Sequence, residues 1–134
     1  MGPNGVYSVE TGRTFWEACK RVQEKAGLEG FRVLHLFDVQ AALKEKGLES
    51  GPTVIVEVCN AALASEALRS DPKAALLLPC KVVVQEIGKK VVLSTLLPES
   101  LVEGGDLKAL AQKVGVKLMS LIDTAASVPS CCRI

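Results

Sequence analysis

The chain has 134 residues, of which 49% are hydrophobic, so it is long enough to bury one core and too short for two. Its 16 basic and 15 acidic side chains are spread along the sequence, and this balance, without a basic block, argues against nucleic-acid binding. No apolar run approaches the ~20 residues that span a bilayer, and the first ten residues lack a signal core, so we expect no membrane anchor and a cytoplasmic location.

The chain begins with an alternating segment and an amphipathic helix. Residues 6–11 alternate apolar and polar side chains, which predicts a strand at or near the edge of a sheet. Thr14 and Glu17 form a capping box, in which the threonine hydroxyl accepts a hydrogen bond from the Glu17 amide, and a helix is predicted over 14–28. Cys19 lies on the apolar stripe of this helix, so we assign it to the core.

The second predicted strand covers 31–37. Strict alternation places four side chains on one of its faces: Phe31, Val33, His35 and Phe37. His35 is the only histidine, and a single histidine holds zinc only when cysteines or carboxylates join it, so a partly buried histidine with a hydrogen-bond partner is the simpler interpretation. Asp38 then caps a short helix that Gly47 ends.

The third predicted strand, 53–59, has three valines on one face: Val54, Val56 and Val58. Glu57 lies on the other face, where a carboxylate must be solvated, paired or protonated. An exposed sheet face explains this glutamate more simply than a role as general base. Asn60 is placed to cap the helix that follows, which Asp71-Pro72 ends.

The last third of the domain contains a hairpin and a long helix. Strands are predicted over 80–87 and 90–97, and a helix over 107–125 with Asp106 as its cap. Gly115 costs this helix about 1 kcal/mol relative to alanine, so we expect another element to pack closely against it.

One domain is predicted over 1–126, with a tail at 127–134. An odd count of five cysteines without a secretory signal indicates free thiols. Cys131 and Cys132 in the tail match no prenylation box, and we interpret them as reactive thiols of a frayed terminus. The chain has only two asparagines and four glutamines, which favours a thermophilic source.

The candidate ligand site consists of Cys59 and Asn60 at the end of the third strand and Cys80 at the start of the fourth. Cys59 directly precedes a helix N-terminus, where the dipole favours a thiolate. Each residue also has a structural interpretation, since asparagine caps helices and small cysteines are common in cores. Parallel strands would separate the two thiols by the length of the sheet, whereas antiparallel strands let them share one site. We expect the antiparallel arrangement.

No metal site is predicted. Cys59 and Cys80 with His35 supply three ligands at best, and the chain has no C-x-x-C pair. The glycines never approach the spacing of a phosphate-binding loop, and no cofactor or reaction can be assigned from the sequence.

Three segments, AGLEGFRVLHLFDVQAALKEKG, VEVCNAALASEAL and LLLPCKVVV, resemble a prokaryotic family known as domain of unknown function 302. The resemblance runs from about Tyr7 to Pro98. The matching positions are Gly30, Phe31, Asp38, Val39, Lys44, Cys59, Asn60, Ala67, Leu68, Leu78, Pro79, Cys80 and Val82. The resemblance implies a small α+β fold with helices against a largely antiparallel sheet, in proteins that often pair, and it implies no established activity.

We therefore predict an α+β two-layer sandwich, with a largely antiparallel five-stranded sheet and helices packed on one face, because alternation in all five strands implies one buried face each. The function that we expect is a small non-catalytic binding or scaffolding module that self-associates as a homodimer. The alternative is a thiol-bearing small-ligand or redox site formed by Cys59, Asn60 and Cys80, with a role in sulfur or metal handling.

Overall fold

The computed structural model describes residues 3–129, which form one sheet and four α-helices. The strands are β1 (Val6–Thr11), β2 (Arg32–Asp38), β3 (Thr53–Cys59), β4 (Cys80–Ile87) and β5 (Lys90–Leu96). The α-helices are α1 (Phe15–Lys25), α2 (Val39–Lys44), α3 (Ala61–Ser70) and α4 (Gly105–Ala126). Short 3-10 helices lie at η1 (Pro3–Gly5), η2 (Ala26–Glu29), η3 (Pro72–Leu77) and η4 (Pro98–Leu101).

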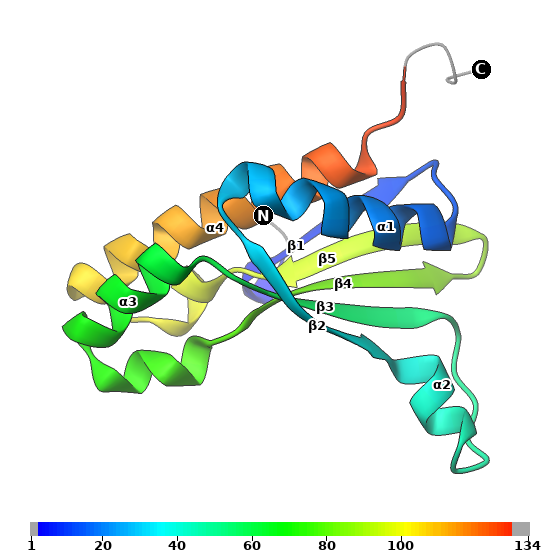
Figure 1. Ribbon diagram of the computed structural model, residues 1–134, viewed down its shortest axis with the longest axis horizontal. Coiled ribbons are helices and arrows are strands. Elements are labelled where there is room, and N and C mark those ends of the chain that lie inside the picture. The colour runs from blue at the N-terminus through cyan, green and yellow to red at the C-terminus, as the bar shows by residue number, and fades with distance from the viewer. Residues whose placement is uncertain (1–2, 130–134) are drawn as a thin grey trace.

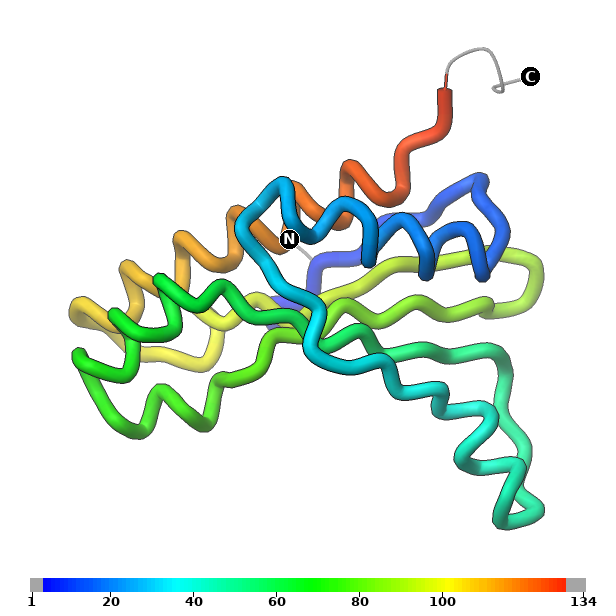
Figure 2. The backbone as a smooth tube through the Cα atoms, viewed as in Figure 1, coloured from blue at the N-terminus to red at the C-terminus, as the bar shows by residue number. Residues whose placement is uncertain are grey.

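The sheet is antiparallel throughout, and its strand order is β1-β5-β4-β3-β2. Helices α1 and α4 cover one face of it, while α2 projects from one end and α3 with η3 lies at the other end (Figure 1). The backbone trace shows the same arrangement, with α2 leading away from the body of the molecule (Figure 2). The predicted α+β sandwich with helices on one face is confirmed.

The core lies between the sheet and the two long helices. The valines predicted to share one face of β3, Val54, Val56 and Val58, are all buried. They pack in one cluster with residues of α1 and α4, among them Val22 and Leu118. Cys19 is buried in this cluster, so the prediction that it is a core residue is confirmed.

The predicted faces of β2 are wrong at one end of the strand. The pairing with β3 contains a bulge between Val33 and His35, which inserts Leu34 as an extra residue. Because one extra residue reverses the alternation, Val33 falls opposite buried Val58, whereas His35 falls opposite Glu57 on the other face. Val33 and His35 therefore do not share a face, contrary to strict alternation.

Three of the predicted helix caps are confirmed by hydrogen bonds to the side-chain oxygens of Thr14, Asp38 and Asn60. The predicted cap at Asp106 is wrong. Helix α4 begins at Gly105, so the N-cap is Gly104, and Asp106 lies inside the first turn. A carboxylate there still favours the helix through the dipole, although it does not cap it.

Gly115 lies where α4 passes the end of β5, and the predicted close packing is confirmed. A Cβ atom at this position would lie 3.2 Å from Oε1 of Glu99 and 3.5 Å from Cδ2 of Leu97. The missing side chain thus lets α4 approach the segment that follows β5. No helix within residues 3–129 combines the length and apolarity needed to cross a membrane.

Candidate functional site

The candidate site lies at the end of the sheet where β3 finishes and β4 starts. These strands are antiparallel neighbours, and Val58 is directly opposite Cys80. Residues 60–79 therefore leave the sheet and return to it at the same end, as expected from the antiparallel alternative. This excursion contains α3 and η3, which place apolar side chains above the start of β4.

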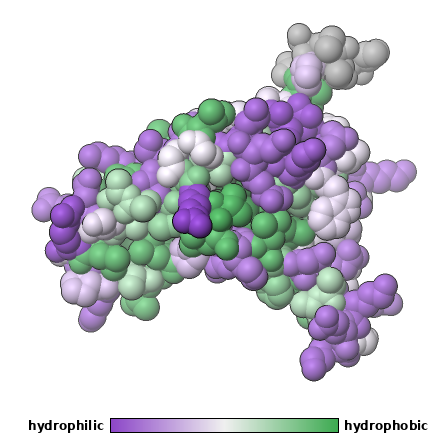
Figure 3. Space-filling model, viewed as in Figure 1, coloured by the Kyte–Doolittle hydropathy of each residue, from purple (hydrophilic) through white to green (hydrophobic). Residues whose placement is uncertain are grey.

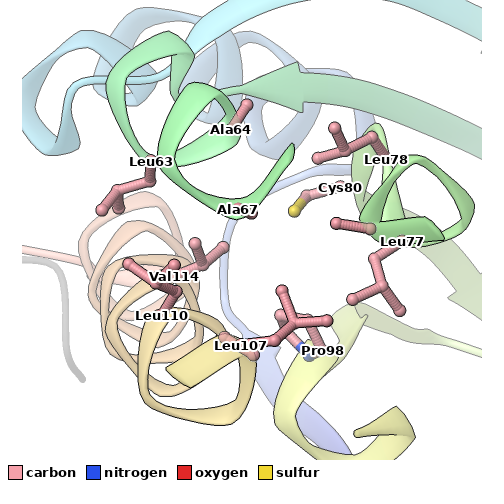
Figure 4. Close-up of a pocket in the computed structure, with 12 residues that line it drawn as sticks. Leu63, Ala64, Ala67, Leu77, Leu78, Cys80, Pro98, Leu107, Leu110 and Val114 are labelled. Atoms are coloured by element: carbon pink, nitrogen blue, oxygen red, sulfur yellow. The ribbon is translucent and has the colours of Figure 1, made fainter. Parts of the chain in front are cut away.

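Cys80 faces an apolar cavity. Its place opposite buried Val58 puts its side chain on the helix-covered face, and its sulfur points into the space between α3, η3 and α4 (Figure 4). The cavity has a volume of about 30 Å³. Its walls are Leu63, Ala64, Ala67, Ala74, Leu77, Leu78, Cys80, Pro98, Leu107, Leu110, Ala111 and Val114. The thiol is thus the only wall side chain that is not a hydrocarbon.

Burial raises the pKa of the Cys80 thiol to about 11, and the neighbouring Cys59 contributes to the same shift. At neutral pH this group is therefore protonated. Because the thiolate is the nucleophile, a thiol of this kind reacts slowly and serves better as a soft, weakly polar contact than as an attacking group.

Cys59 lies beside Cys80 in the sheet and on its other face. Its partner in the ladder is Arg32, one position beyond the Val33–Val58 pair that faces the helices. Both cysteines are free and partly buried. The fold thus brings the two thiols onto neighbouring strands, with side chains directed to opposite faces of the sheet.

Asn60 has both ends of its amide engaged by the backbone. Its Oδ1 accepts a hydrogen bond from the Leu63 amide at 3.1 Å, and its Nδ2 donates to the Glu29 carbonyl at 3.4 Å. Gly30 packs against it, since a Cβ atom on this glycine would lie 2.9 Å from the Asn60 Nδ2. Asn60 therefore caps α3 and also ties this helix to η2.

His35 and Glu57 lie outside the cavity, on the sheet face that α1 and α4 leave uncovered. Nδ1 of His35 is 3.1 Å from Oε1 of Glu57, and the imidazole is largely exposed. The predicted position of Glu57 on an exposed sheet face is confirmed, and its carboxylate is paired there. Among the residues that the structure describes, no three His, Cys, Asp or Glu side chains form a possible metal-binding group.

Sequence reasoning missed the cavity, although one signal pointed toward it. The stripe on α3 contains Leu63, Ala64 and Ala67, and short alanine side chains leave space where a leucine would fill it. Helical spacing on α4 gave no distinction between Leu110, which lines the cavity, and Leu121, which is buried in the core. Cys131 and Cys132 lie outside the described residues.

A second candidate region is the edge strand β2. Three large apolar side chains on either side of His35 are exposed along it: Leu34 at 53%, Leu36 at 39% and Phe37 at 43%. Helix α1 packs mainly over β3, β4 and β5. In the space-filling view, apolar surface gathers below α1, where β2 runs (Figure 3).

Comparison with known proteins identifies the family. The chain matches the family described as domain of unknown function DUF302 over residues 7–125, so the match continues through α4, past the Pro98 limit of the resemblance. No curated protein matches the chain. A crystal structure of an uncharacterized conserved DUF302 protein from Bacillus stearothermophilus is similar, with a TM-score of 0.87 and 32% sequence identity over 92% of this chain and 98% of that chain. The resemblance drawn from the sequence is confirmed, and the chain belongs to the DUF302 family of unknown function.

Proposed function

We propose that this protein is a non-catalytic binding module that self-associates as a homodimer through edge strand β2. The supporting observation is the exposure of Leu34, Leu36 and Phe37 on that strand. An edge strand presents unpaired N–H and C=O groups, and exposed apolar side chains beside them favour pairing with another chain.

The geometry favours a second copy of the chain as the partner. Two β2 strands related by a two-fold axis run antiparallel. The backbone N–H and C=O groups of each edge then pair with those of the other, and the two sheets become continuous. The bulge at Leu34 interrupts only one end of the strand and leaves residues 35–38 in regular register with β3. This regular half carries Leu36 and Phe37.

Light scattering on the purified full chain tests the proposal. We expect a dimeric mass for the wild type and a monomeric mass for Phe37→Glu, because burying an unpaired carboxylate in the interface is costly. Ile87→Glu is the matched control, since Ile87 is also exposed, at 58%, but lies at the hairpin between β4 and β5. A monomeric wild type, or equal masses for the two variants, would refute the proposal.

The second candidate function is the thiol-bearing ligand or redox site of Cys59, Asn60 and Cys80. It is supported by the Val58–Cys80 pairing, which brings the two cysteines to neighbouring strands. Alkylation of the native protein with iodoacetamide at pH 7, followed site by site with mass spectrometry, tests it. Fast reaction at Cys59 or Cys80 supports this function, and slow reaction at both contradicts it.

We also propose a reducing cytoplasm as the location and a thermophilic source. Free thiols at Cys19, Cys59 and Cys80 support the first, because such thiols persist in reducing compartments. The low count of heat-labile amides, two asparagines and four glutamines, supports the second. A melting temperature typical of mesophilic domains, roughly 45–65 °C, would contradict the thermophilic source.

A further inference from the structure

Helix α2 and the turn that follows it form an arm, residues 39–50, which contributes little to the core. The arm leads away from the body of the molecule beyond the end of β2 (Figure 1, Figure 2). Helix α2 has no buried residue, and Leu48 in the turn is 57% exposed. The arm therefore presents an apolar side chain away from the domain to which it belongs.

The arm has a defined shape, although it is not packed into the core. The Leu48 amide donates a hydrogen bond to the Leu43 carbonyl at 3.0 Å, and Nε2 of Gln40 donates to the Ser50 carbonyl at 3.0 Å. These bonds fold the turn back onto α2 and leave a hollow of about 390 Å³, large enough for a leucine side chain. Its walls are Gln40, Lys44, Gly47, Leu48, Glu49 and Ser50. A preformed surface of this kind costs little ordering on binding.

A second exposed leucine lies at the opposite end of β2. Leu28 belongs to η2, which precedes the strand, and its side chain is 70% exposed. Gly30, with a φ of 77°, turns the chain from η2 into β2. Within one chain the seven-residue strand, ~23 Å long, separates Leu28 from Leu48, so the two side chains cannot contact each other.

Pairing of two β2 strands about a two-fold axis exchanges these ends, because the start of each strand then lies beside the end of the other. We place the axis near Leu36, within the exposed apolar stretch. Measured along the strand, Arg32 at the start of β2 then lies ~13 Å from the axis, and Lys44 at the end of α2 lies ~16 Å from it in the other direction. Since these distances agree, η2 of each copy falls beside the arm of the other.

We propose that Leu28 of each copy docks beside Leu48 of the other copy, in the hollow of the arm. This inference rests on the proposed self-association through β2 and names the surface that completes it. A stable interface involves about 20–30 residues a side, whereas β2 has seven. The two arm contacts, which are equivalent by symmetry, extend the interface at both ends of the paired strands.

Cross-linking between differently substituted chains tests the proposal. Leu28→Cys and Leu48→Cys are prepared separately, mixed until subunits exchange and treated with a short bis-maleimide, and the linked peptides are identified by mass spectrometry. Because the two substitutions are on different chains, a link between positions 28 and 48 forms only between copies. Leu101→Cys replaces Leu48→Cys in the control mixture, since Leu101 is 59% exposed and lies in η4, beyond β5. We expect the 28–48 link in at least tenfold higher yield than the 28–101 link.

Dissociation constants of the dimer test whether the two leucines contact each other. Leu28→Ser and Leu48→Ser should each raise the dissociation constant at least tenfold in analytical ultracentrifugation, and Leu101→Ser should change it less than twofold. All three side chains are exposed, so the variants should fold, which circular dichroism checks. The combined Leu28→Ser, Leu48→Ser variant should raise the constant by less than the product of the single effects, because residues in contact are not independent.

The outcomes separate this contact from self-association itself. A dimeric wild type that becomes monomeric in Phe37→Glu, yet forms no 28–48 link, rejects the arm contact and leaves pairing through β2 in place. A monomeric wild type overturns both. Equal yields in the two mixtures, or single effects that multiply in the combined variant, would contradict the docking of Leu28 beside Leu48.

Discussion

The two edges of the sheet, β1 and β2, have the same backbone chemistry and very different surroundings. On β1 the most exposed side chains are polar, Ser8 and Glu10. Its inward side chains are tied to α4, since Tyr7 donates to Asp123 at 2.6 Å and Thr11 donates to the Ala126 carbonyl at 2.6 Å. Within residues 3–129, the side-chain hydrogen bonds of β2 go to Glu57 and Ala41 rather than to α1 or α4, and the strand exposes apolar side chains.

This difference indicates that the tendency of an edge strand to pair with another chain depends on the elements that cover it as well as on its own residues. Polar outward residues and a helix alongside make β1 a poor partner for another chain. Strand β2 is the other edge of the sheet and pairs only with β3 in it. This asymmetry supports the proposal that β2, rather than β1, is the edge that pairs with a second copy of the chain.

Transferring the apolar character of β2 to β1 should have the largest effect on assembly. In the double variant Ser8→Leu, Glu10→Phe, both edge strands expose apolar side chains and can pair with other chains. Each chain then pairs through β1 as well as through β2, so assembly no longer stops at the dimer. Light scattering should show masses above a dimer that grow with concentration. A mass unchanged from the wild type would show that exposed apolar residues do not govern edge pairing here.

Removing one hydrogen bond between β1 and α4 should have a moderate effect on the free energy of unfolding. Thr11→Val loses the donor to the Ala126 carbonyl and should lower the free energy of unfolding by about 1 kcal/mol, measured in urea. Ser8→Ala is the control, because its hydrogen bond to Ser94 is exposed to solvent, and it should cost less than about 0.5 kcal/mol. Equal losses of unfolding free energy in the two variants would contradict a stabilising role for the hydrogen bond from Thr11 to Ala126.

The Tyr7–Asp123 tie should give a smaller, pH-dependent effect. The hydrogen bond to Asp123, and secondly burial, raise the pKa of Tyr7 above 10. Because the folded protein holds this proton more tightly than the unfolded chain, the stabilisation is full below pH 10 and is lost as the pH rises through the folded pKa. Tyr7→Phe should flatten the stability profile above pH 10, measured by urea unfolding at a series of pH values, and an unchanged slope would contradict a stabilising role for this hydrogen bond.

Local features of the fold were predictable from the sequence because neighbouring residues determine them. Period-two alternation located the five strands, and the side chains of Thr14, Asp38 and Asn60 located helix starts. The alternation of residues 6–11 also predicted a strand at or near an edge, and β1 lies at one. Each of these signals lies within a few residues of the feature that it predicts.

Features that depend on distant partners were not predictable. The bulge at Leu34 is set by the register between β2 and β3, so strict alternation misplaced Val33 relative to His35. The cavity is formed by segments around Leu63, Leu77 and Leu110, whose helical spacing is the same for core and cavity walls. The wrong assignment of Asp106 as the cap has a local cause. Gly104 and Gly105 precede it, and they carry no side chain that marks where the helix begins.

The pairing of β1 with β5 also has a consequence for biosynthesis. Val6 is opposite Leu96, so the first strand to leave a ribosome must wait for a partner made about 90 residues later. At roughly 5–20 residues per second, this delay is on the order of 5–20 seconds. Strands β2 to β5 are sequential neighbours and can form hairpins as they emerge, whereas β1 can dock only when the rest of the sheet is present. The edge closed by α4 is therefore the one that is completed last.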